Sequence, residues 1–191
     1  MTAAHREQTS SEGGLPPQGA GDAGYAFRTV FEADLDYVCA SLHRLGARGP
    51  DVEDVAHDVF LVLVEKMSTL DRTRPLRPWL FGVAMRLLYA HRRKLRASTE
   101  VPTSSPDALD SAPSPSDLAL AAEQRRLVDA ALDDLSDEQR AVFVLHAVDD
   151  VAMPEVASAL EIPLNTAYSR YRLAREAFTR AVRRTKLGGL P

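Results

Sequence analysis

Residues 153–178 read MPEVASALEIPLNTAYSRYRLAREAF, and this stretch decides the fold of the C-terminal part of the chain. Apolar residues recur at steps of three and four, which predicts helices over 153–160 and 164–184 joined by a short turn. We expect Ile162 to fill the turn and the small Ala157 to let the two helices cross closely. The layout is that of a helix-turn-helix, whose second helix reaches base edges in the major groove of DNA with its first turn.

The charges of the chain are unevenly distributed. Its 191 residues include 23 Lys and Arg against 27 Asp and Glu, a formal net charge of −4. Residues 86–96 nevertheless hold five basic residues and no acid, and residues 165–186 hold seven basic residues and one acid, whereas residues 129–161 hold nine acids and one base. Two separate basic stretches indicate two contacts with anionic partners. The basic helix pair could also be a solvated hairpin, but salt bridges to the acidic stretch would account for only some of its arginines.

The remaining patterns are helical as well. Apolar stripes predict helices over 27–45, 51–67 and 78–96, with Gly46 ending the first, Asp51 capping the second and Pro78 opening the third.

Further helices are expected over 117–134 and 141–148. Ser136 and Gln139 stand between these two helices at the spacing of a capping box. Alternating strand patterns of any length are absent from the sequence, so the predicted fold class is all-α.

Two stretches contain few large apolar residues and divide the chain. Residues 1–24 are rich in Gly, Pro and Ser and are expected to form a disordered tail. Residues 97–117 are rich in Ser, Thr and Pro and contain no basic residue, which predicts a flexible linker. The prediction is therefore two small helical domains, 25–96 and 118–186, followed by a short tail at 187–191.

Several classes of protein are excluded by composition. Cys39 is the only cysteine, which excludes a disulfide scaffold, and Cys39 with His43 alone makes no metal site. The sequence contains neither an apolar run long enough to span a membrane nor an N-terminal signal peptide, so we expect a cytoplasmic protein. It also lacks a phosphate-binding glycine loop and a plausible pair of catalytic carboxylates. We therefore expect neither an enzyme nor a cofactor.

Three segments resemble a known family. Residues 51–67 (DVEDVAHDVFLVLVEKM) and 70–96 (LDRTRPLRPWLFGVAMRLLYAHRRKLR) resemble region 2 of bacterial RNA polymerase sigma factors of the extracytoplasmic-function type, group 4 of the sigma-70 family. Residues 132–175 (LDDLSDEQRAVFVLHAVDDVAMPEVASALEIPLNTAYSRYRLAR) resemble region 4 of the same family. The resemblance covers 27–96 and 118–184. It implies an alternative sigma factor that directs core RNA polymerase to two-element promoters and assists DNA melting.

The resemblance also implies partners and site residues. For docking on the clamp helices of the largest polymerase subunit, the implied residues are Asp51, Asp54, His57, Asp58 and Leu61. For promoter melting and contact with the −10 element, they are Arg86, Tyr89, His91, Arg92, Arg93 and Lys94. For contact with the −35 element, they are Thr166, Tyr168, Ser169, Arg170, Arg172 and Arg175. The further partners implied are the flap of the second-largest subunit and an anti-sigma factor.

We expect the −35 residues to contact two different parts of the DNA, the phosphates and the bases. Arg170 and Arg175 are predicted to contact phosphates, with the other four residues nearer the bases.

The sequence departs from the family pattern at several positions. Glu161 stands where the turn usually has Gly, so a left-handed backbone there would be strained. The other departures are Gly82 for a basic residue, Arg86 and Ala90 for Asn and Asp, His57 for Gln, Asn165 for Gly and Tyr168 for Lys or Arg. They leave the family resemblance intact and the preferred promoter sequence open.

Two other classes of protein compete with the sigma interpretation. A stand-alone helix-turn-helix repressor would dimerise and bind palindromic duplex DNA without polymerase. A partner-switching protein that mimics the sigma fold would need no basic melting surface, and the basic residues at 92–94 argue against it.

Overall fold

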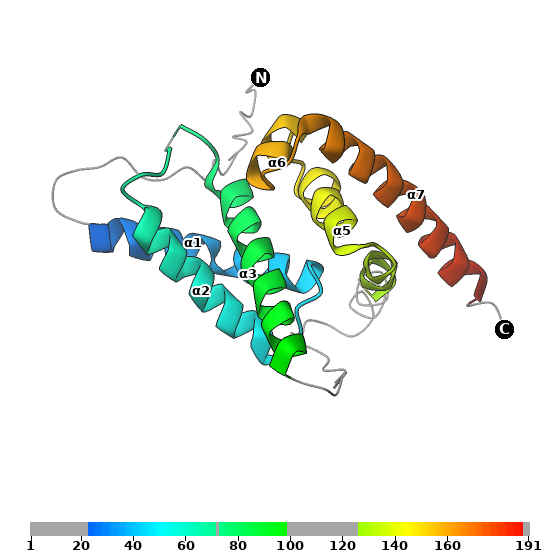
Figure 1. Cartoon of the computed structure of the whole chain (residues 1–191), viewed down its shortest axis with the longest axis horizontal. Coiled ribbons are helices and arrows are strands. Elements are labelled where there is room, and N and C mark those ends of the chain that lie inside the picture. Colours follow the sequence, from blue (N-terminus) through cyan, green and yellow to red (C-terminus); the bar gives the residue numbers. More distant parts are fainter. Residues whose placement is uncertain (1–22, 72, 99–125, 189–191) are drawn as a thin grey trace, which may run out of the picture.

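The computed structural model describes residues 23–71, 73–98 and 126–188, and every regular element in these ranges is a helix (Figure 1). The predicted all-α fold class is thereby confirmed. Nearly all of the expected N-terminal tail and linker, and the end of the C-terminal tail, lie outside the described residues, as does the first part of the helix expected over 117–134.

Three helices form the N-terminal unit: α1 (Ala23–Arg44), α2 (Pro50–Lys66) and α3 (Leu76–Ser98). Each packs against the other two around a core of aliphatic side chains. Gly46 follows α1 with a φ of +88°, a left-handed conformation that glycine adopts without strain, and so ends that helix as the sequence predicts.

Two details of this unit differ from the sequence prediction. Gly49 and not Asp51 occupies the N-cap of α2, and Pro50 is its first residue. The Asp51 carboxylate lies instead 3.1 Å from Nε2 of His91 on α3. The third helix begins at Leu76, so Pro78 is its third residue and not its first; the first turn still tolerates proline because its amide has no helical acceptor.

The C-terminal unit comprises helical residues 126–133, then α5 (Asp137–Phe143), the π-helical turn η1 (Val144–Val148), α6 (Met153–Ala159) and α7 (Leu164–Gly188). The predicted capping box is present at the start of α5. The Gln139 amide donates to Oγ of Ser136, and the Ser136 amide donates to the Gln139 side chain.

Small residues let the helix-turn-helix pack closely. Ala167, Ala174 and Ala181 recur every seven residues along α7 and are buried. Next to them Phe178 stacks on Phe143 of α5, with ring centroids 4.6 Å apart. Because α7 buries mainly alanines, the larger polar side chains on its other faces remain at the surface.

The end of α1 contacts the C-terminal unit at Asp149, and helix α3 lies between α2 and that unit (Figure 1). The main contact of α3 with the C-terminal helices is with α6, while α7 packs against α5 and α6 on the outer side. The fold therefore places one basic stretch, on α3, at the junction of the two units and the other, on α7, at the periphery.

Two leucines on α2 test this description of the core. Leu63 is fully buried and Leu61 is 50% exposed. We expect Leu63→Ala to lower the free energy of unfolding by about 2–5 kcal/mol, because it removes buried methyl groups and leaves a cavity. Leu61→Ala on the same helix is expected to change it by less than about 1 kcal/mol. Urea unfolding followed by circular dichroism measures both, and equal effects would contradict the assigned burial.

Candidate nucleic-acid interface

Helix α2 presents an acidic and apolar face to solvent. Asp54, His57, Asp58 and Leu61 are all exposed and follow one another at steps of three, one and three residues, so they share one side of the helix. Asp51, the fifth residue predicted for polymerase docking, is only partly exposed and is engaged by His91. The structure therefore brings four of the five predicted residues together on an open surface and directs the fifth toward α3.

The predicted melting residues of α3 fall into three groups. Arg93 and Lys94 are exposed near the end of the helix. His91 contacts Asp51 within the N-terminal unit. The remaining residues, Arg86, Tyr89 and Arg92, are partly buried and face the C-terminal unit, as the following contacts show.

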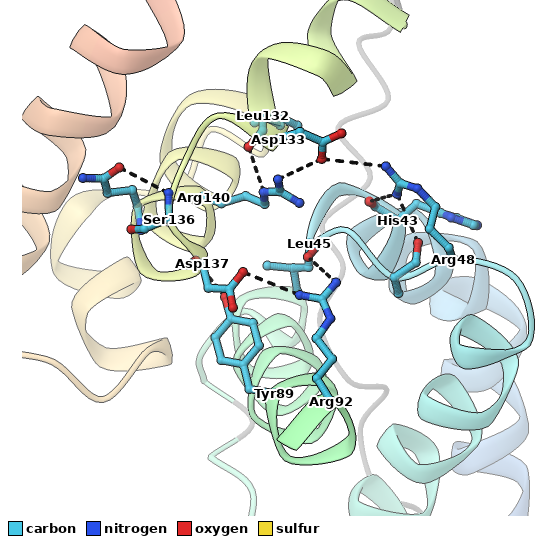
Figure 2. Close-up of polar contacts among 12 residues, drawn as sticks. His43, Leu45, Arg48, Tyr89, Arg92, Leu132, Asp133, Ser136, Asp137 and Arg140 are labelled. Atoms are coloured by element: carbon cyan, nitrogen blue, oxygen red, sulfur yellow. Dashed lines mark hydrogen bonds and ion pairs between the residues drawn. The ribbon is translucent and has the colours of Figure 1, made fainter. Parts of the chain in front are cut away.

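Asp137, the first residue of α5, receives two side chains from α3 (Figure 2). The Tyr89 hydroxyl donates to its backbone carbonyl at 2.7 Å, and an Arg92 guanidinium nitrogen lies 3.5 Å from its carboxylate. Burial, followed by the nearby Asp137 charge, raises the pKa of the Tyr89 phenol well above its ordinary value. Tyr89 therefore stays a neutral hydrogen-bond donor at physiological pH.

Arg140 completes the same contact from the C-terminal side (Figure 2). Its guanidinium is buried, donates to the Leu132 carbonyl at 2.9 Å and pairs with Asp133 at 2.9 Å. The φ of +88° at Gly46 favours glycine there, and a guanidinium nitrogen of Arg140 occupies the space that a Cβ atom at this position would fill. Asp133 also lies 3.8 Å from Arg48 of the N-terminal unit.

A third contact between the units centres on Asp149, which sequence reasoning did not single out. Its carboxylate accepts a hydrogen bond from the Tyr37 hydroxyl at 2.9 Å and pairs with Arg44 at 3.1 Å. Burial raises the pKa of the Asp149 carboxyl, and the two partners oppose that shift. Arg77 lies over the Tyr37 ring and pairs with Asp34 at 2.8 Å, which fixes the ring from behind.

The first turns of α7 are open to solvent. Tyr168 is 53% exposed, and Ser169, Arg172 and Arg175 are exposed as well. Thr166 and Arg170 are partly buried.

Local contacts steady these side chains without burying them. Arg170 lies 3.8 Å from Glu138 on α5, and Arg172 pairs with Glu176 one turn along α7. The structure therefore gathers the six predicted −35 residues on the first turns of one helix, at the position from which a helix-turn-helix reaches DNA.

Comparison with known proteins agrees with this arrangement. Residues 30–98 match the family described as "Sigma-70 region 2", and residues 125–178 match "Sigma-70, region 4". The two matches occur in one chain in the order of the family and together span more than half of it. The chain belongs to the sigma-70 family of sigma factors.

Its relatives place this sigma factor among those of the extracytoplasmic-function type, as its motifs predicted. It is 24% identical over 167 residues to the ECF RNA polymerase sigma factor SigW of Bacillus subtilis, covering 83% of this chain and 89% of the relative. It is also 24% identical over 143 residues to the ECF RNA polymerase sigma-E factor of Escherichia coli, covering 69% and 74%.

Solved structures share the fold. The sigma factor RpoE in complex with the anti-sigma factor NepR from Bartonella quintana superposes with a TM-score of 0.67 at 20% identity, over 82% of this chain and 96% of that one. CnrH in complex with the cytosolic domain of CnrY gives a TM-score of 0.56 at 23% identity, over 82% and 86%. No helix in the described ranges is long and apolar enough to cross a membrane.

The turn of this sigma factor's helix-turn-helix holds a strained residue. Glu161 has a φ of +56°. This is the left-handed backbone conformation that the sequence analysis expected to be strained in a residue other than glycine. The Glu161 carboxylate lies 3.0 Å from Arg86 on α3, and the side chain is 71% exposed.

We expect Glu161→Gly to raise the free energy of unfolding by up to about 1 kcal/mol, because glycine adopts this backbone without strain and the exposed ion pair contributes little. Asp150→Gly, at a φ of +54°, is the control and should gain less, since Asp tolerates the conformation better. Urea unfolding measures both. A destabilised Glu161→Gly variant would mean that the Arg86 contact outweighs the strain.

Proposed function

We propose that this protein is an alternative sigma factor that binds core RNA polymerase, directs it to two-element promoters and assists DNA melting. The observation that carries the proposal is the presence of both family regions in one chain, each with an exposed surface suited to a different partner. It acts in the cytoplasm, where core polymerase and promoter DNA are found.

The polymerase surface is the exposed face of α2. Acidic side chains at Asp54 and Asp58 surround the half-exposed Leu61, and Val64, one turn further along, is also 50% exposed. Such a surface suits a basic helical partner, because the charges steer the encounter and the apolar side chains contribute affinity once they are buried. We assign the clamp helices of the largest subunit to this face and the flap of the second-largest subunit to the C-terminal unit.

The two DNA surfaces have different tasks. The exposed first turns of α7 suit the major groove of the duplex −35 element. On α3, we assign the cations from Arg86 to Lys94 to separated strands near the −10 element, since unstacked bases need cationic and aromatic partners. An anti-sigma factor is the further partner that we propose, since the two superposed sigma-fold structures hold a protein partner.

Run-off transcription on a promoter library tests the function. The purified chain added to core polymerase is expected to initiate at templates that share two sequence elements, and neither component alone should do so. Leu61→Asp should lower initiation at least tenfold by weakening the hold on core polymerase, whereas Val128→Asp, at a 41% exposed site of the C-terminal unit, should not. DNA binding without polymerase association or initiation would instead support a repressor.

Arg172 and Arg175, the two exposed arginines among the six −35 residues, are expected to differ in role. Arg175→Ala should reduce the slope of log affinity against log salt by about one and leave base preference unchanged, as for a lost phosphate contact. Arg172→Ala should change the preferred −35 sequence. Holoenzyme binding to a −35 library at several salt concentrations measures both quantities, and a changed preference in Arg175→Ala would reverse the assignment.

A further inference from the structure

Helix α7 is longer than reading one major groove requires. Its 25 residues span about 37 Å, whereas the groove is about 12 Å wide. The residues assigned to the −35 element end at Arg175, so more than three turns of α7 follow them. Those turns carry Arg180, Arg183 and Arg184, which are exposed and have no part in the proposed function.

Ion pairs divide the arginines of α7 into two groups. Three of them pair with acidic residues of the C-terminal unit: Arg170 with Glu138, Arg172 with Glu176 and Arg184 with Asp134. Within the ranges that the structure describes, the guanidinium groups of Arg175, Arg180 and Arg183 have no acidic partner. Arg175 is already assigned to DNA. Arg180 and Arg183 are therefore the arginines of α7 that neither an internal ion pair nor the proposed function accounts for.

Arg180 and Arg183 continue the face of α7 that is assigned to DNA. Eleven residues make just over three helical turns, so residues eleven positions apart lie almost on one line along the helix. Arg180 therefore follows Ser169, and Arg183 follows Arg172, on the exposed side. Their alignment with two −35 residues, and not their charge alone, points to a shared ligand.

The neighbouring Arg184 differs from them in position and in contacts. It lies eleven residues after Leu173, to one side of the line that joins Arg172 and Arg183. There its guanidinium pairs with Asp134. Two adjacent arginines with the same charge thus have different surroundings, one open to a partner and one engaged within the unit.

The helix dipole does not account for the two unpaired arginines. The negative end of the dipole favours cations, but the effect falls off within the last turn of a helix. Residues 185–188 form the last turn of α7, and both Arg180 and Arg183 precede it. Their charges are therefore not explained as a local stabilisation of the helix end.

Distance decides which part of a DNA duplex Arg180 and Arg183 reach. Eleven residues advance a helix by about 16 Å, which exceeds the width of the major groove. With Ser169 and Arg172 within the groove, the two distal arginines lie beyond its base edges. The DNA there presents phosphates, which guanidinium groups bind in charge-assisted hydrogen bonds.

We propose that Arg180 and Arg183 extend the duplex contact of α7 to phosphates that flank the −35 element. The first turns of the helix read bases, and its later turns hold the adjoining backbone over at most about five further base pairs. The partner is the same duplex, because the two arginines continue the face that meets it. The inference rests on the proposed function in one respect, namely that α7 is the helix that binds the −35 element.

The salt dependence of holoenzyme binding tests this contact. The probe is a duplex that carries the −35 element with ten base pairs on each side and ends before the −10 element. Arg180→Ala and Arg183→Ala should each reduce the slope of log affinity against log salt by about one, and the double variant by about two, with base preference unchanged. Arg184→Ala, which removes the same charge from the same helix, is the matched control and should leave the slope unchanged.

Shortening the duplex locates the contact. Base pairs outside the −35 element are removed one at a time, first from one end and then from the other. The parent should lose about tenfold or more in affinity on one side, within the first five base pairs, because two phosphate contacts are lost. The double variant should show no such loss on that side. A double variant that responds to shortening as the parent does would overturn the proposal.

The remaining outcomes separate the contact from its alternatives. Circular dichroism should show unchanged helix content and unfolding midpoint in all variants, because alanine favours helix at least as well as arginine. An unchanged slope in the double variant, with initiation intact, would overturn the DNA contact and leave an acidic protein surface as the partner of these arginines. An equal fall in Arg184→Ala would overturn it too, since the slope would then follow net charge. A parent holoenzyme that does not bind the −35 duplex would overturn the proposed function and, with it, this contact.

Discussion

The arrangement of this molecule depends on how closely the end of α6 approaches the middle of α3. At Gly82 there is no room for even a methyl group, so two backbones meet there with no side chain between them. Once that contact is made, the start of α5 lies within reach of Tyr89 and Arg92, as their contacts with Asp137 show. Helix α3 packs its apolar side against α1 and α2, so only its polar side is left to contact α5 and α6. That polar side carries the basic residues of α3.

Opposite charges within one chain make this contact possible. The acidic stretch at 129–161 supplies carboxylates and carbonyls, and the basic end of α3 supplies guanidinium groups. Most of these pairs are partly exposed, so each contributes little by itself, and salt weakens them further. The units are thus held together by many weak pairs around one tight backbone approach and not by any single ion pair. The net charge of −4 hides this internal complementarity.

The candidate site could be predicted from the sequence only in part. The exposed residues of α7 and the acidic face of α2 follow from helical periodicity, because the apolar residues that face the core determine which side is left for solvent. The contact of Asp149 with Tyr37 and Arg44 could not be predicted in this way, since its partners are 112 and 105 residues away in sequence. Asp51 was misplaced for a related reason: a cap is a local expectation, whereas its actual partner, His91, is on another helix.

The sequence by itself determined the all-α fold class, the capping box at Ser136, the helix stop at Gly46 and the membership of the sigma-70 family. These features depend on residues within a few positions of one another, or on motifs that keep their spacing along the chain. Only the tertiary structure decided that Gly82 and Glu161 belong to one contact and that half of the predicted melting surface is covered. That outcome depends on the fit in shape and charge between residues that are far apart in sequence, which no local pattern encodes.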